Sequence, residues 1–108
     1  MLRDALPRLS NLLGAYFHQD CFMDHPDADS ILAFYVDSES ASTIKQALRE
    51  LDQFLATTED DAAIEKALYH SFYMSYLPTG DGWPSQRAWL EHVREQVQML
   101  LAKKEEPE

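Results

Sequence analysis

The sequence predicts an all-α fold: a single compact bundle of about five helices, with one long aromatic-rich loop before the last helix. Three observations favour it. The 108 residues include only three glycines, too few for a turn-rich β-sandwich. Apolar residues recur at spacings of three and four, the period of an amphipathic helix. Residues that cap helices, such as serine, threonine and aspartate, precede most of these apolar stripes. The length fits one domain, expected over residues 1–103, and the polar end KKEEPE predicts a frayed tail over residues 104–108.

The first helix is expected from about Pro7 to His18. Proline suits a first helical turn, because its missing N–H has no partner there. The residues that would face the core share helical spacing: Leu6, Leu9, Leu13, Tyr16 and Phe17.

A second helix is expected after the break at His25-Pro26, because the residue before a proline is pushed away from helical torsions. Asp27 or Asp29 can cap it, and it would run through residues 31–36. A strand over residues 31–36 is the alternative, since this run is short and rich in β-forming side chains. The caps and the lack of alternation favour the helix.

The third helix is expected from Ser40 or Ser42 to about residue 56, and Thr57 or Thr58 would cap the fourth. Their inward stripes are Ile44, Leu48, Leu51 and Leu55, then Ile64, Leu68 and Phe72. The acids at residues 59–61 suit the positive end of the fourth helix's dipole, which gives them a structural role.

The only long loop is SFYMSYLPTGDGWP, residues 71–84, whose prolines and glycines are typical of turns. Its aromatic side chains predict that it packs onto the helices. Ser85 would cap the last helix, from Gln86 to about Ala102. The side chains expected to face inward are Trp89, Val93, Val97 and Leu100.

The net charge of −10 is concentrated in the middle of the chain. Residues 20–65 contain twelve acids and only two bases, whereas acids and bases balance in the remainder. Such a field repels nucleic acid and anionic membranes and attracts cationic partners. We therefore expect no binding to nucleic acid and none to a membrane. Solubility alone is the alternative explanation, because net charge bears on association and not on fold.

The lone cysteine cannot form an internal disulfide, which favours a reducing, cytoplasmic location. Asp4 and Pro7 interrupt what would have to be the apolar core of a signal peptide. No stretch approaches the roughly 18–20 apolar residues of a membrane span. A soluble protein that is not exported is the expectation.

The densest group of reactive side chains lies in YFHQDCFMDH, residues 16–25. His18, Cys21 and His25, with Asp20 or Asp24, offer donor types that zinc accepts, but their spacing matches no zinc pattern. A thiol-dependent enzyme would use Cys21 as nucleophile and His18 as base, although sequence neighbours rarely converge in that way. A packed helix end beside an acidic surface is the simpler interpretation. It implies no metal, no cofactor and no catalytic residue.

Two motifs carry a resemblance to a known family. The first is LLGAYFHQD, followed by the acidic stretch, and the second is Tyr76-Leu77-Pro78 with Gly80 and Gly82, leading to Arg87-Ala88-Trp89-Leu90. These resemble the motifs of CdiI-type immunity proteins from bacterial contact-dependent growth inhibition systems, over about residues 5–101. One position departs from the family pattern, which usually has tryptophan after the aspartate where this chain has Cys21. A smaller side chain there would change how residues 20–25 sit.

The resemblance implies a protein that binds and neutralises a cognate toxin C-terminal domain, often a nuclease, without catalysis, as a monomer in a 1:1 complex. The acidic centre suits this role, because nucleases that act on RNA or DNA carry basic clefts. The residues expected to contact the toxin are acids of the central segment and one aromatic anchor: Asp20, Asp24, Asp27, Asp29, Tyr35, Asp37 and Glu39. An acidic adaptor for another basic protein is the alternative, as is a small metal- or thiol-dependent enzyme.

Overall fold

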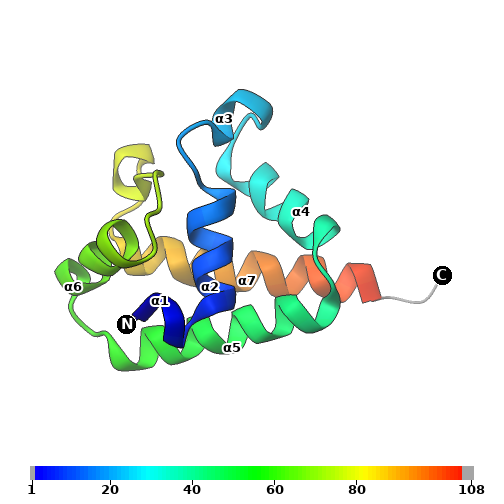
Figure 1. Cartoon of the computed structure of the whole chain (residues 1–108). Coiled ribbons are helices and arrows are strands. Elements are labelled where there is room, and N and C mark those ends of the chain that lie inside the picture. Colours follow the sequence, from blue (N-terminus) through cyan, green and yellow to red (C-terminus); the bar gives the residue numbers. More distant parts are fainter. Residues whose placement is uncertain (1, 106–108) are drawn as a thin grey trace.

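Five long helical segments build the fold, with short helices between them (Figure 1), in a computed structural model that describes residues 2–105. In chain order the elements are α1 Leu2–Ala5, α2 Pro7–Ser10, η1 Asn11–Tyr16, α3 Cys21–Asp24, α4 Ala28–Ser38, α5 Ala41–Thr57, α6 Asp61–Lys66, η2 Ala67–Ser71, η3 Pro78–Asp81 and α7 Gln86–Glu105. The π-helical turns η1 and η2 continue α2 and α6, and η3 is a 3-10 turn. No strand occurs in this part of the chain, so the all-α prediction is confirmed and residues 31–36 are helical.

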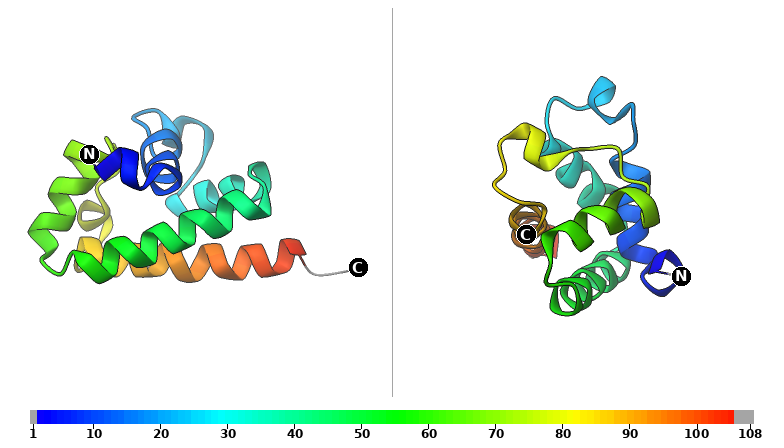
Figure 2. Two further views of the ribbon diagram at one scale, coloured as in Figure 1. Left: turned by 60° about the horizontal axis from the view of Figure 1, so that its bottom comes forward. Right: turned by 90° about the vertical axis from the view of Figure 1, so that its left-hand side faces the viewer.

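The longest helix, α7, packs against both α4 and α5. Figure 2 (left) shows α5 and α7 side by side, with the N-terminal helices crossing above them. The apolar stripes predicted from the sequence face the core that these helices enclose. Most residues of these stripes are fully buried, and the half-buried exceptions are Tyr16, Leu48 and Leu100. In α7, Leu101 is buried where Leu100 was expected to be.

Three aromatic rings at one end of the core join the segments that carry the two sequence motifs. Phe17 follows η1, Tyr76 comes from the loop, and Trp89 comes from α7. Their ring centroids lie 5.2 Å apart for Phe17 and Trp89, 5.2 Å for Tyr76 and Trp89, and 5.6 Å for Phe17 and Tyr76. Such tilted and edge-to-face pairs add stability beyond the area they bury. The prediction that the loop packs onto the helices is therefore confirmed.

Three helix starts lie where the capping residues predict them. The Asp27 carboxylate accepts the backbone N–H of Ser30 at 2.8 Å and begins α4. Ser40 caps α5 in the same way, and the Ser85 hydroxyl accepts the N–H of Ala88 at 3.0 Å in the first turn of α7. Each side chain satisfies an N–H that has no partner within its helix.

The predicted start of the fourth helix is wrong by several residues. Thr57 is the last residue of α5, where its hydroxyl donates to the carbonyl of Gln53 at 2.9 Å, and α6 begins only at Asp61. The Arg87 guanidinium binds this connection, because it donates to the carbonyl of Leu55 at 3.0 Å and also to that of Thr58. A group from a distant helix thus covers the carbonyls that the end of α5 leaves open.

Two other helix ends also differ from the prediction. The first helical segment ends at Tyr16, because Phe17 leaves the helical region at φ −101° and its carbonyl accepts the N–H of Ser75 at 2.9 Å. The last helix continues to Glu105, beyond the expected start of the frayed tail. The Lys104 ammonium donates to the carbonyls of Val36 at 2.6 Å and Glu39 at 2.7 Å, which holds this end of α7 against α4. Residues 106–108 of the expected tail lie outside the described residues.

Candidate functional site

The acids expected to contact a partner, apart from Asp20, line three hollows of the surface and do not share one flat face. The first hollow lies between η1 and α4 and has a volume of about 620 Å³. Two histidines, two acids and two aromatic residues line it, together with one asparagine and one alanine: His18, His25, Asp24, Glu39, Tyr16, Phe34, Asn11 and Ala15. Phe34 is half exposed here, and its ring lies against that of His25 in a tilted arrangement, with ring centroids 5.0 Å apart.

A short hydrogen bond crosses this first hollow, because the Tyr16 hydroxyl donates to Glu39 at 2.5 Å. Burial, and then the bond to the Glu39 carboxylate, raise the pKa of Tyr16 to about 12. Glu39 is therefore held by the fold and only partly available to a partner.

The Tyr16 contact predicts a loss of stability in alkali. The pKa of Tyr16 in the folded chain exceeds its ordinary value of 10.0, so its stabilising effect is complete below pH 10 and is lost as the pH rises toward 12. We expect the free energy of unfolding to fall over that range and the substitution Tyr16→Phe to make the fall shallower. Urea unfolding at several pH values measures both slopes. Tyr73→Phe, at an exposed ring, is the matched control and should leave the slope as it is. A slope that Tyr16→Phe does not change would contradict the assignment.

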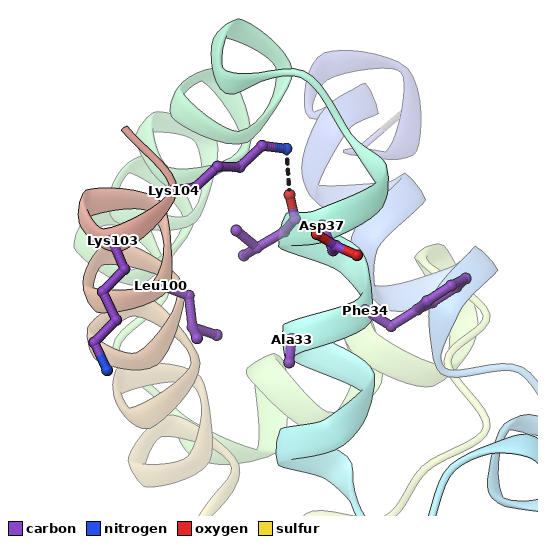
Figure 3. A pocket seen from close by; sticks show the side chains of 7 residues that line it. Ala33, Phe34, Asp37, Leu100, Lys103 and Lys104 are labelled. Atoms are coloured by element: carbon purple, nitrogen blue, oxygen red, sulfur yellow. Dashed lines mark hydrogen bonds between the residues drawn. The ribbon is translucent and has the colours of Figure 1, made fainter. Parts of the chain in front are cut away.

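The second hollow lies between α4 and the end of α7, with a volume of about 550 Å³, and holds Asp37. Figure 3 shows the Lys104 side chain reaching from α7 to the backbone of α4, while Phe34 points away from α7. Lys103 and Lys104 both line this hollow. Two positive charges near Asp37 weaken its attraction for a cationic partner.

The third site is a pair of adjoining cavities between α3 and the segment of residues 76–83, which we call the α3–η3 cleft. The outer cavity has a volume of about 470 Å³ and the inner one about 160 Å³, and they share Asp27, Tyr76 and Asp81. The outer cavity is also lined by Phe22, Pro26, Leu77 and Gly80. The inner one is also lined by Ala28, Asp29, Trp83 and Trp89. Neither lining includes a lysine or an arginine.

The other predicted contact residues divide between this cleft and the loop before α3. Asp27 and Asp29 line the cleft, where Asp29 also pairs with His92 at 2.8 Å. Asp20 is exposed on the loop, and its backbone N–H donates to the imidazole of His18 at 3.1 Å. Tyr35 does not lie where the prediction needs it. It is 0% exposed in the core, so it cannot touch a partner directly.

Several acids of the central segment stabilise the fold and are not part of an open surface. Glu50 is 4% exposed, and its carboxylate accepts the backbone N–H groups of Arg8 at 2.8 Å and Leu9 at 3.0 Å. Asp61 accepts the backbone N–H groups at the start of α7, and Asp52 pairs with Arg94 at 2.8 Å. The negative charge of the central segment is therefore only partly available to a partner.

The proposed thiol or metal centre is not assembled. Cys21 is 3% exposed, and burial raises the pKa of its thiol, which disfavours the reactive thiolate. His18 and His25 line the first hollow, but Cys21 is not among its lining residues. Among residues 2–105, no group of three or more histidine, cysteine and acidic side chains is placed to hold a metal ion.

Sequence reasoning missed four side chains that shape the α3–η3 cleft. Phe22 and Leu77 are 45% and 49% exposed at its rim, and Asp81 and Trp83 line it from the loop. Asp81 lies outside the acidic segment, so a charge count could not point to it. The signal that could have found it is the second motif, since Asp81 stands between its two glycines.

No helix in the described part of the chain is both long and apolar enough to cross a membrane.

Comparison with known proteins connects this geometry with a family. The family model of the CdiI immunity protein matches residues 5–97. Among solved structures, the chain matches one from a crystal structure of a CdiA-CT/CdiI complex from Y. kristensenii, with 32% sequence identity and a TM-score of 0.83. That match covers 91% of this chain and 99% of the other. No curated protein matches the chain in sequence. The family match spans most of the chain, and the chain therefore belongs to the CdiI immunity protein family.

Proposed function

We propose that this chain binds and neutralises the cognate CdiA-CT toxin domain of a contact-dependent growth inhibition system. It acts in the cytoplasm as a monomer in a 1:1 complex, with no catalysis of its own and no cofactor. The observation that carries this proposal is the match, across 91% of this chain, to a chain of a CdiA-CT/CdiI complex.

We further propose that the toxin domain is a nuclease whose basic cleft meets the acidic surface around α3 and α4. The supporting observation is the set of carboxylates that the fold leaves unused. Within residues 2–105, the carboxylates of Asp20 and Asp24 accept no hydrogen bond and form no ion pair. Opposite fields speed encounter and give specificity, which suits a protein that must intercept a toxin before it acts.

Co-expression tests the function directly. The partner to use is the C-terminal domain encoded by the reading frame beside this gene. We expect cells that express the domain alone to stop growing, and cells that also express this chain to grow and to yield a stable complex of the two. Growth arrest in both cultures, with no complex on purification, would overturn the proposed function.

The electrostatic part predicts slower association after charge reversal. Asp20→Lys/Asp24→Lys should reduce the association rate with the toxin domain by about tenfold at low salt, and less at high salt, because salt screens exposed charges. Asp27 is left intact, since it caps α4. Stopped-flow fluorescence measures the rates.

A matched control separates local charge from net charge. Glu59→Lys/Asp60→Lys makes the same charge change in the connection between α5 and α6, at the opposite end of the molecule from α3 (Figure 1). We expect this pair to slow association much less. Equal slowing by both pairs, or none by the first, would remove Asp20 and Asp24 from the contact surface.

A further inference from the structure

We propose that the α3–η3 cleft is the anchor point of the complex and that it binds an arginine side chain of the toxin domain. The inference rests on the proposed function for the identity of the partner. It adds the face of the molecule that is used and the chemical group that enters it.

The mouth of the cleft is apolar. Phe22 of α3 and Leu77 before η3 are large hydrophobic side chains that remain 45% and 49% exposed. The Phe22 ring lies against Tyr76, with centroids 5.5 Å apart, so this wall is packed against the aromatic core. Exposed apolar side chains next to a cavity are typical of the anchor points of protein interfaces. The aliphatic stem of a long basic side chain would pack here.

The inner part of the cleft is negatively charged. Asp27, Asp29 and Asp81 all line the inner cavity, and neither cavity is lined by a lysine or an arginine. The Tyr76 hydroxyl donates to Asp81 at 2.7 Å. Burial, then Asp81 and then Asp29 raise the pKa of Tyr76, so the field of both carboxylates converges on this ring. A cationic group is the occupant that such a field favours.

A buried donor in the same cavity is an independent sign of a missing ligand. Trp89 lines the inner cavity and is 0% exposed, yet its indole N–H finds no acceptor in the described part of the chain. Buried N–H groups are nearly always hydrogen-bonded, so one that lines a cavity calls for an acceptor there. A guanidinium only donates, so it satisfies the carboxylates, and the acceptor for the indole N–H is a main-chain carbonyl of another residue in the toxin segment that carries the arginine.

The size and shape of the cleft favour arginine over lysine. The inner volume of about 160 Å³ is roughly five times the share of a liquid water molecule, enough for a four-atom guanidinium. A planar guanidinium stacks on aromatic rings and bonds a carboxylate with two parallel N–H groups, whereas an ammonium has no planar face and no fixed fork of donors. Trp83 is the half-buried ring that lines the same cavity as the carboxylates, and His92, which pairs with Asp29, packs against it with ring centroids 4.8 Å apart. The other two hollows lack this combination, because one has a single carboxylate beside two lysines and the other has two carboxylates beside two histidines.

The first test removes charge from the cleft and keeps its hydrogen bonds. In Asp27→Asn/Asp81→Asn, each side-chain amide oxygen can still accept, from the N–H of Ser30 and from the hydroxyl of Tyr76. We expect the complex with the adjacent-gene toxin domain to dissociate at least about tenfold faster at high salt, where long-range steering is screened. Glu59→Gln/Asp60→Asn, which removes the same charge elsewhere, should leave dissociation within about twofold. A complex of the cleft variant that dissociates at the unchanged rate would overturn the inference and leave the proposed function standing.

The second test needs no toxin. The two tryptophans of the chain give two indole N–H signals in an NMR spectrum, assigned by Trp83→Phe. Methylguanidinium chloride added to the free protein should shift both signals more than methylammonium chloride at the same concentration, and the cleft variant should lose the difference. Equal shifts with the two salts, or no shift with either, would overturn the inference whether or not the toxin domain binds.

Discussion

Gly14→Ala is expected to lower the free energy of unfolding by about 3 kcal/mol. Gly14 lies in η1, at the point where this helix passes the main chain of Phe72. A Cβ atom at Gly14 would overlap the carbonyl oxygen of Phe72. The obstacle is backbone and not the end of a flexible side chain, so η1 or the loop segment must move as a whole. Urea unfolding of the two purified proteins measures the loss.

Gly80→Ala is the matched control for this prediction. A Cβ there would meet the side chain of Leu77 at 3.2 Å, and that side chain can give way, so we expect a change within about 0.5 kcal/mol. The displaced segment in Gly14→Ala carries Ser75, bonded to the Phe17 carbonyl at 2.9 Å, and next to it Tyr76 of the cleft. Toxin binding should therefore weaken together with stability. An alanine variant as stable as the parent would mean that η1 does not approach the loop so closely.

The helical period predicted the core well because burial of one helix face is a local property of the sequence. The same period could have shown that Tyr35 is buried. Ile31, Leu32, Tyr35 and Val36 have the spacing of one buried face of α4, which leaves Phe34 as the exposed aromatic ring. Tyr35 was expected on the surface because aromatic anchors are common at interfaces, and this general preference outweighed the local pattern.

Helix ends were predicted where the cap is local and missed where the cap comes from elsewhere. Asp27, Ser40 and Ser85 each bond a residue three positions ahead, which a sequence pattern can show. The missed start of α6 follows a connection whose Leu55 and Thr58 carbonyls are bound by Arg87, and the missed end of α7 is held by the Val36 and Glu39 carbonyls that Lys104 reaches. These contacts join positions tens of residues apart, so no local pattern contains them.

The candidate site was only partly predictable, because composition does not distinguish the uses of a carboxylate. Asp24 and Glu50 belong to the same acidic segment, but the first is exposed beside a hollow and the second is buried as a cap. The cleft combines acids of α4 with Asp81 from the second motif, and only the fold brings them together. The two sequence motifs mark residues that support the cleft and not the carboxylates inside it. Their aromatic residues Phe17, Tyr76 and Trp89 form the cluster on which the cleft is built.

Glu50→Ala is expected to destabilise the chain by about 3 kcal/mol, although it reduces the net negative charge. One oxygen of Glu50 accepts the N–H groups of Arg8 and Leu9 at 2.8 and 3.0 Å, and the other accepts the side-chain amide of Gln46 at 3.0 Å. A carboxylate at the start of α2 also faces the positive end of that helix. Alanine leaves two backbone donors near the core without an acceptor. The desolvation of these N–H groups is then not compensated by hydrogen bonds, and this is the main cost.

Glu59→Ala separates this effect from the change in charge. It removes the same charge from an exposed residue, so its free energy of unfolding should stay within about 0.5 kcal/mol of the parent value. Hydrogen exchange gives a local readout, because the amides of Arg8 and Leu9 should lose protection in Glu50→Ala and keep it in Glu59→Ala. If both variants were equally stable, or if those amides stayed protected, Glu50 would not be the acceptor that stabilises the start of α2. The burial of this carboxylate would then lack the compensation that its three hydrogen bonds provide.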